Sequence, residues 1–139
     1  MQLVLGKRGD YAIRAVLDIA AHDGERRKTR EIAARMSMPQ KYLSRILAEL
    51  VGADVLRATA GQAGGYQLSR PPEQITLLEV IEAVEGSTQI RDCLLRNAPC
   101  GTRQVCSLHH AWVEAEEAML KKLRATTFAD VRGPIPVWD

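Results

Sequence analysis

Apolar residues recur at three- and four-residue steps through much of the chain, the spacing that places side chains on one face of a helix. The first such stretch predicts a helix over residues 10–21. A shorter helix is expected over residues 30–36, with Thr29 as its N-terminal cap. A third helix, over residues 39–52, has Pro39 at its first position, where the missing N–H costs nothing. Two helices joined by a short turn form the pattern of a helix-turn-helix.

A β-hairpin is predicted directly after the third helix. Residues 55–58 and 66–68 flank a glycine-rich tip, residues 60–65, and the second flank alternates apolar and polar side chains. A hairpin in this position is the wing of a winged helix-turn-helix. Beyond it, a capping box over residues 76–79 opens a fourth helix that ends near Glu85.

Residues 86–106 have no usable periodicity, and an ordered loop of this length is uncommon without a functional reason. A long helix is expected after this loop, ending near Arg124. Too little of the chain remains to bury its apolar stripe, so we expect a second copy of the chain to cover it in a homodimer. Residues 126–131 are expected to add one helical turn, and residues 133–139 to form a mobile tail or a docking arm. The stripe consists of Leu108, Trp112, Ala115, Met119 and Leu123.

Positive charge is concentrated in the N-terminal part. Residues 1–58 hold eleven Lys or Arg against seven Asp or Glu, whereas residues 59–139 hold eight against ten. The first part is therefore the better candidate for binding a polyanion, with a chance surface fluctuation as the alternative. The polar face of the third helix has the side chains that contact base edges and phosphates of double-stranded DNA, or it is a plain solvated face. The candidate residues on it are Gln40, Lys41, Ser44 and Arg45, and Tyr42 on the same helix is a further candidate for DNA contact.

The wing tip is a second candidate DNA contact. Its glycines, Gly64 among them, allow the backbone to approach a phosphate or the minor groove, and Gln62 is the one side chain there that can hydrogen-bond. A simple hairpin turn is the alternative, because glycine turns are common.

The composition favours a mainly α fold, because helix formers dominate and aromatic residues make up only 4% of the chain. The predicted fold class is therefore mainly α with a small β-hairpin wing. We expect a winged helix-turn-helix DNA-binding domain over residues 1–72. A linker helix, the cysteine loop and a long dimerisation helix follow over residues 73–125, and residues 126–139 form a C-terminal tail.

All the cysteines of the chain lie close together: Cys93, Cys100 and Cys106, followed by His109. In a reducing compartment such cysteines indicate metal binding or redox chemistry before structural disulfides. Thiolates suit iron–sulfur clusters and zinc, but the C-x2-C pairs that zinc sites favour are absent, so the spacing favours a cluster. Zinc, a regulatory disulfide and three unrelated buried thiols are the alternatives.

The sequence also argues against other classes of protein. No apolar run approaches the length of a membrane span and no signal-peptide pattern opens the chain, so we expect a cytoplasmic location and no membrane partner. An enzyme is not expected, because the chain has no Cys-His-Asp constellation and no phosphate-binding loop. The rival hypothesis is a winged-helix interaction module with structural zinc or no metal.

Several stretches, taken in their order and spacing, resemble the IscR and NsrR family of bacterial iron–sulfur regulators from Leu3 to about Arg124. The matching stretches are residues 10–15, the recognition-helix pattern that starts at Tyr42 and runs to residue 50, the wing residues 64–68, the helix start at residues 76–81 and the pattern Cys106-x-x-His109-x-x-Trp112.

The resemblance implies a homodimer whose C-terminal helices cross, with a [2Fe–2S] or [4Fe–4S] cluster in each cysteine loop near the partner's DNA-binding domain. Oxidation, nitrosylation or loss of the cluster would change operator affinity in response to iron, redox state or nitric oxide. The implied ligands are Cys93, Cys100 and Cys106, with either His109 or the residue matching Asp10 in the partner subunit as the fourth.

The sequence departs from the family at two points. Six residues separate the first two cysteines where five are common, and Ala60 stands at the start of the wing tip where the family has an arginine. The resemblance therefore does not extend to a wing arginine in the minor groove.

Overall fold

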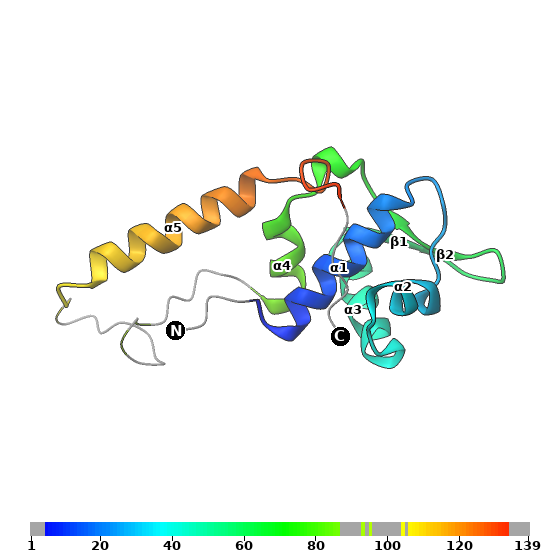
Figure 1. The fold of residues 1–139 in the computed structure, drawn as a ribbon, viewed down its shortest axis with the longest axis horizontal. Coiled ribbons are helices and arrows are strands. Elements are labelled where there is room, and N and C mark those ends of the chain that lie inside the picture. The colour runs from blue at the N-terminus through cyan, green and yellow to red at the C-terminus, as the bar shows by residue number, and fades with distance from the viewer. Residues whose placement is uncertain (1–4, 87–92, 94, 96–103, 105, 134–139) are drawn as a thin grey trace.

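The fold consists of a helical head, a wing and one long separate helix. The computed structural model describes residues 5–86, 93, 95, 104 and 106–133. The head is formed by helices α1 to α4, the wing projects from one side of it, and the last helix extends away on the other side (Figure 1). The elements are α1 (Lys7–Ala21), α2 (Thr29–Met36), α3 (Gln40–Gly52), β1 (Leu56–Thr59), β2 (Gly65–Leu68), the short 3-10 helix η1 (Pro72–Gln74), α4 (Leu77–Glu85) and α5 (His109–Ala125).

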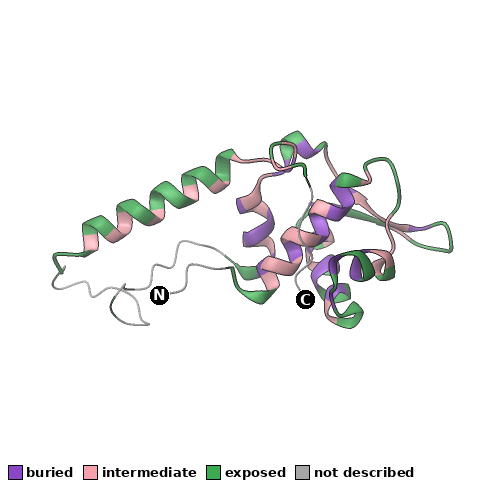
Figure 2. Cartoon of the chain, viewed as in Figure 1, coloured by how far each residue is buried: buried purple, intermediate pink, exposed green. Residues whose placement is uncertain are grey.

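The apolar stripes predicted from the sequence meet in one core inside the head. The stripe of α3 is buried completely, and it packs with buried residues of α1, α2 and α4 (Figure 2). Removing this apolar surface from water is the main term that stabilises the head. The predicted fold class, mainly α with a small β-hairpin wing, is therefore confirmed. The buried α3 residues are Leu43, Ile46, Leu47 and Leu50.

Several helix starts differ from their predicted positions. α1 begins at Lys7 rather than at residue 10. Thr29 is the first residue of α2 and not its cap. The N-cap is Lys28, one residue before the predicted cap, and the Glu31 carboxylate accepts its backbone N–H at 3.0 Å. Pro39 immediately precedes α3 with an extended backbone.

The predicted cap of α4 is confirmed. Oγ1 of Thr76 accepts the backbone N–H of Glu79 at 3.1 Å, which satisfies one of the N–H groups that a helix start leaves without an intrahelical partner.

The wing is a two-stranded antiparallel hairpin in which Leu56 pairs with Leu68 and Thr59 pairs with Gly65. Its tip requires glycine at position 64, because a Cβ there would lie 2.0 Å from the carbonyl oxygen of Thr59. The wing is extended by the segment before α2, since Arg27 forms an isolated antiparallel bridge with Tyr66 of β2.

The chain returns to the head after α5, and the helical turn predicted over residues 126–131 is confirmed only in part: a turn closed by the backbone N–H of Asp130 and the carbonyl oxygen of Thr127 at 3.1 Å is present, but it does not continue α5. Thr127 instead forms an antiparallel bridge with Thr76, and the backbone N–H of Leu77 donates to the carbonyl oxygen of Thr126 at 2.9 Å. The physical reason is Phe128, whose side chain is fully buried in the core of the head. The extended backbone at Thr126 ends α5 and lets the chain turn inward with this side chain, whereas another turn of α5 would have continued away from the core.

No helix in the described part of the chain is long and apolar enough to cross a lipid bilayer.

Candidate nucleic-acid interface and cysteine segment

α3 presents a polar face to solvent. Gln40, Lys41, Ser44 and Arg45 are all exposed, on the side opposite the buried leucines. Oγ of Ser44 donates to the carbonyl oxygen of Gln40 at 3.1 Å, so its hydroxyl lies along the helix. The structure thus brings these four predicted residues onto one accessible surface, with two cations and an amide that can contact phosphates and base edges.

Tyr42 lies apart from this polar face. Its ring packs edge to face against the ring of Tyr11 on α1, with ring centres 5.2 Å apart. Nζ of Lys7 lies 5.8 Å from the centre of each ring. Tyr42 is half-buried, and these contacts fix it between α3 and α1.

The two wing-tip candidates have different environments. Gln62 is exposed, but Gly64 is buried and its backbone N–H donates to the carbonyl oxygen of Gly61 at 3.1 Å. Gly64 therefore shapes the turn, and Gln62 is the tip residue that presents a polar side chain.

The predicted cysteine ligands fall in the least described part of the chain. Cys100 lies outside the described residues, Cys93 is half-buried and Cys106 is exposed. Cys106 lies in the turn before α5, where its carbonyl oxygen accepts the backbone N–H of His109 at 3.0 Å. The ring centre of His109 lies 5.5 Å from that of His110. Among the residues that the structure describes, no three His, Cys, Asp or Glu side chains gather as a metal site would require.

Asp10, the alternative fourth ligand, is held by an ion pair on α1. Its two carboxylate oxygens accept Nε of Arg14 at 2.8 Å and Nη2 of Arg14 at 3.1 Å. A bidentate pair of this kind fixes the carboxylate in one orientation.

The end of α4, where the cysteine segment begins, is joined to the rest of the head through α1. Nε of Arg8 donates to the carbonyl oxygen of Val84 at 3.0 Å, and the carboxylate of Glu85 accepts the backbone N–H of Gly9 at 3.1 Å. Arg8 also forms an ion pair with Glu49 on α3, and this hydrogen bond raises the pKa of the Arg8 guanidinium above its ordinary value. No local pattern in the sequence marks this junction, because it joins residues that are far apart in the chain.

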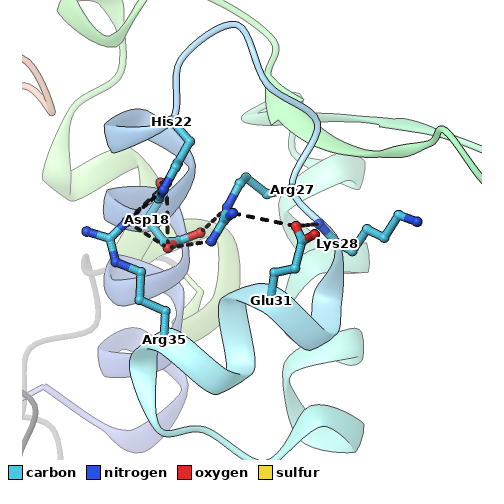
Figure 3. Close-up of polar contacts among 6 residues, drawn as sticks. All are labelled: Asp18, His22, Arg27, Lys28, Glu31 and Arg35. Carbon is cyan, nitrogen blue, oxygen red and sulfur yellow. Dashed lines mark hydrogen bonds and ion pairs between the residues drawn. The ribbon is translucent and has the colours of Figure 1, made fainter.

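A buried carboxylate joins α1 to α2 and to the segment before it (Figure 3). Asp18 has no exposed surface, and its oxygens accept Nε of Arg27 at 3.0 Å and Nη1 of Arg35 at 3.3 Å. Nδ1 of His22 lies 2.8 Å from the backbone oxygen of Asp18. The hydrogen bond to Asp18 raises the pKa of Arg27. The sequence did carry a signal for this cluster: an acidic residue among the apolar positions of the first helix needs cationic partners if it is buried.

The chain is similar to transcriptional regulators along almost its whole length. Residues 5–133 match the model of the Rrf2 family, described as an iron-dependent transcriptional regulator. Protein rrf2 of Nitratidesulfovibrio vulgaris is 35% identical over 91% of this chain and 85% of its own length. The HTH-type transcriptional regulator NsrR of Geobacillus kaustophilus is 32% identical over 88% of this chain and 84% of its own.

Solved structures show the same fold. CymR of B. subtilis, described as the global cysteine regulator, superposes with a TM-score of 0.83 at 22% identity, covering 94% of this chain and 97% of that one. The IscR of T. potens superposes with a TM-score of 0.77 at 26% identity, covering 94% and 86% of the two chains.

Proposed function

We propose, because this chain belongs to the Rrf2 family of transcriptional regulators, that it forms a homodimer which binds an operator in double-stranded DNA and senses its signal through an iron–sulfur cluster. As a member of this family it is a DNA-binding regulator and not an enzyme. The operator, the dimer and the cluster are the parts of the proposal that the following observations support.

Operator binding is supported by the accessible polar face of α3. Lys41 and Arg45 are exposed cations that suit phosphates or guanine edges, and Gln40 suits an adenine edge. Gln62 at the wing tip adds a polar group on the neighbouring element. In a two-fold symmetric dimer these surfaces would read two half-sites of a roughly palindromic duplex.

Dimerisation is supported by α5. None of its residues is buried in the single chain, although its apolar stripe continues over the full helix. The exposed fractions of Leu108 and Met119 are 43% and 49%. A matching helix from a second copy would remove this surface from water.

The proposed cluster ligands are Cys93, Cys100 and Cys106, with His109 preferred as the fourth. The donors fit, because thiolates with one imidazole are ligands that iron–sulfur proteins use. Cys106 lies three residues before His109, the first residue of α5, and the backbone N–H of His109 donates to the carbonyl oxygen of Cys106. Asp10 is the weaker candidate, because ligation would have to break its ion pair with Arg14.

A bound cluster would supply a charge and a ligation state that respond to iron supply, redox state or nitric oxide. The protein can relay such a change through the junction at the end of α4. Val84 is held by Arg8, and Arg8 pairs with Glu49 on α3. Reordering of the segment that follows Glu85 would therefore shift α4 against the helix that carries the DNA-reading side chains.

The decisive measurement is metal analysis of protein purified without oxygen. Iron with labile sulfide, visible absorbance and a Mössbauer spectrum of a [2Fe–2S] or [4Fe–4S] centre are expected. The triple variant C93A/C100A/C106A should be colourless and should bind DNA with altered affinity. Protein that stays free of iron and sulfide after reconstitution would end the cluster proposal, with bound zinc indicating a structural site and a reversible disulfide indicating a thiol switch.

The identity of the fourth ligand is tested by substituting each of two adjacent histidines in turn. H109A should shift the absorption spectrum and speed cluster loss, whereas H110A removes the adjacent imidazole and should leave both unchanged. A spectrum altered by D10A and not by H109A would assign the ligand to Asp10 of the partner subunit.

Operator binding is tested with a duplex selected by the wild-type protein from a randomised DNA pool. K41A and R45A should each weaken binding to the selected duplex by roughly tenfold, the loss expected for one good base or phosphate contact. Failure of the wild-type protein to enrich any sequence would refute operator binding.

A further inference from the structure

We propose that Arg26, in the segment before α2, is a DNA-contacting cation at the wing tip. The residues of the wing tip, Ala60 to Gly64, include no charged side chain. A guanidinium beside this tip would supply the positive charge that minor-groove edges and flanking phosphates attract. The inference rests on the proposed operator binding and adds a residue to it.

Arg26 lies at the wing tip although it is far from the tip in sequence. Its Nη1 donates to the carbonyl oxygen of Ala63 at 3.3 Å. The residue is exposed. Because a guanidinium has five N–H donors in a planar fork, this single bond orients the group and leaves donors for a second acceptor.

The backbone next to Arg26 is fixed to the wing. The N–H of Arg27 donates to the carbonyl oxygen of Tyr66 at 3.0 Å, and the N–H of Tyr66 donates to the carbonyl oxygen of Arg27 at 2.8 Å. Gly65 permits this approach, because a Cβ there would lie 2.8 Å from the Arg27 oxygen and its φ is +152°. The segment thus behaves as a short third strand beside the part of β2 that lies next to the wing tip.

Successive side chains of an extended segment point to opposite sides, and this alternation separates the roles of the two arginines. Arg27 points inward, where both carboxylate oxygens of Asp18 accept its guanidinium at 3.0 and 3.3 Å (Figure 3). Arg26 therefore points outward, along the wing. The buried pair holds the segment in place, and Arg26 is the exposed group that it positions.

The test compares R26A with R124A on the selected duplex. Arg124 is an exposed residue in the last turn of α5, so R124A removes one positive charge outside the wing. R26A should weaken binding by about tenfold and reduce the salt dependence of the affinity by about one counterion per subunit, whereas R124A should change neither appreciably. Thermal unfolding of both variants should match the wild type, because neither side chain is buried.

A rescue experiment checks that the position of the charge is what matters. In the R26A background, A60R restores a guanidinium at the wing tip, and A125R adds one at the end of α5 as the matched control. A60R should recover most of the lost affinity and A125R should not. Equal recovery of affinity by A60R and A125R would overturn the assignment of Arg26. So would R26A and R124A proteins that have the same affinity and the same salt dependence.

The outcome also separates this inference from the proposal on which it rests. If the wild-type protein binds the selected duplex and R26A binds it equally well, operator binding stands and Arg26 takes no part in it. A wild-type protein that selects no duplex would overturn both.

Discussion

The backbone N–H of Phe128 donates to the carbonyl oxygen of Ile75 at 3.0 Å, and both side chains are fully buried. A residue from beyond α5 thus completes the core of the head beside the start of α4. We expect F128A to lower the free energy of unfolding by about 3–5 kcal/mol, because it removes a buried ring and leaves a cavity. F128L keeps most of the volume and should cost about 1.5 kcal/mol or less.

Urea denaturation at one fixed protein concentration measures both variants, since dimerisation would make the midpoint depend on concentration. Equal midpoints for F128A and the wild-type protein would show that the ring is not part of the core in solution.

Because the carboxylate of Asp18 is buried, we expect its conversion to an amide to lower the stability of the fold strongly. D18N keeps the shape of the side chain but removes the buried charge that Arg27 and Arg35 share, leaving Arg27 with its longer ion pair to Glu31 at 3.6 Å. We expect a loss of about 3–5 kcal/mol in the free energy of unfolding.

The matched control for D18N is E73Q. Glu73 pairs with Arg132 at 3.5 Å, but its side chain is 62% exposed, so its removal should cost about 1 kcal/mol or less. Similar losses for the two variants in urea denaturation would mean that burial adds nothing to the Asp18 pairs.

The lowered pKa of Glu31 predicts that the stability of the fold depends on pH. The backbone N–H of Lys28 bonds to its carboxylate and lowers its pKa, with Arg27 adding to the effect. A carboxyl with a lowered folded-state pKa stabilises the fold above its unfolded-state pKa, and this contribution is lost as the pH falls through the folded-state value.

The wild type should therefore exceed E31Q in stability at pH 7, and the difference should shrink as the pH is lowered below about 4.5, the ordinary value for Glu. Thermal unfolding from pH 7 to pH 3 measures this difference. A difference that grows on acidification would contradict the direction of the pKa shift.

The apolar stripe of α5 predicts the oligomeric state. M119E places a carboxylate in the proposed dimer interface and should raise the dimer dissociation constant by roughly 100-fold, because the charge would be buried without a partner. K121E makes a comparable change two residues along the helix, on the other side, and should leave the dimer intact. Sedimentation equilibrium measures both, and a dimeric M119E protein would rule out this face as the interface.

The sequence predicted those parts of the molecule that have a local pattern. The helical stripes, the capping box at Thr76 and the hairpin with its glycine tip each depend on residues a few positions apart, and all appear in the structure. Two helices, α1 and α2, begin upstream of their predicted starts, at Lys7 and Thr29. For α2 the reason is that its N-cap is Lys28, a residue type without a usual capping side chain.

The missed features depend on residues that are distant in sequence. Phe128 reaches the core only because the chain turns back after α5, and Arg26 meets Ala63 only because Arg27 pairs with β2. Periodicity reports which face of an element is apolar and not which element covers it. The polar face of α3 is exposed as predicted. Its contact with DNA and the cysteine ligand set both stay predictions, the latter because Cys100 lies outside the described residues.

The burial of Phe128 also determines when the head can become fully packed during synthesis of the chain. Ribosomes release the chain from its N-terminus, so α1 to α4 emerge well before the residue that fills their core. Until the cysteines and α5 have been synthesised, the nascent head lacks this ring and its bond to Ile75. A fully packed head therefore arises only in chains that already carry the cysteines and α5, and we expect prematurely terminated chains to bind DNA poorly.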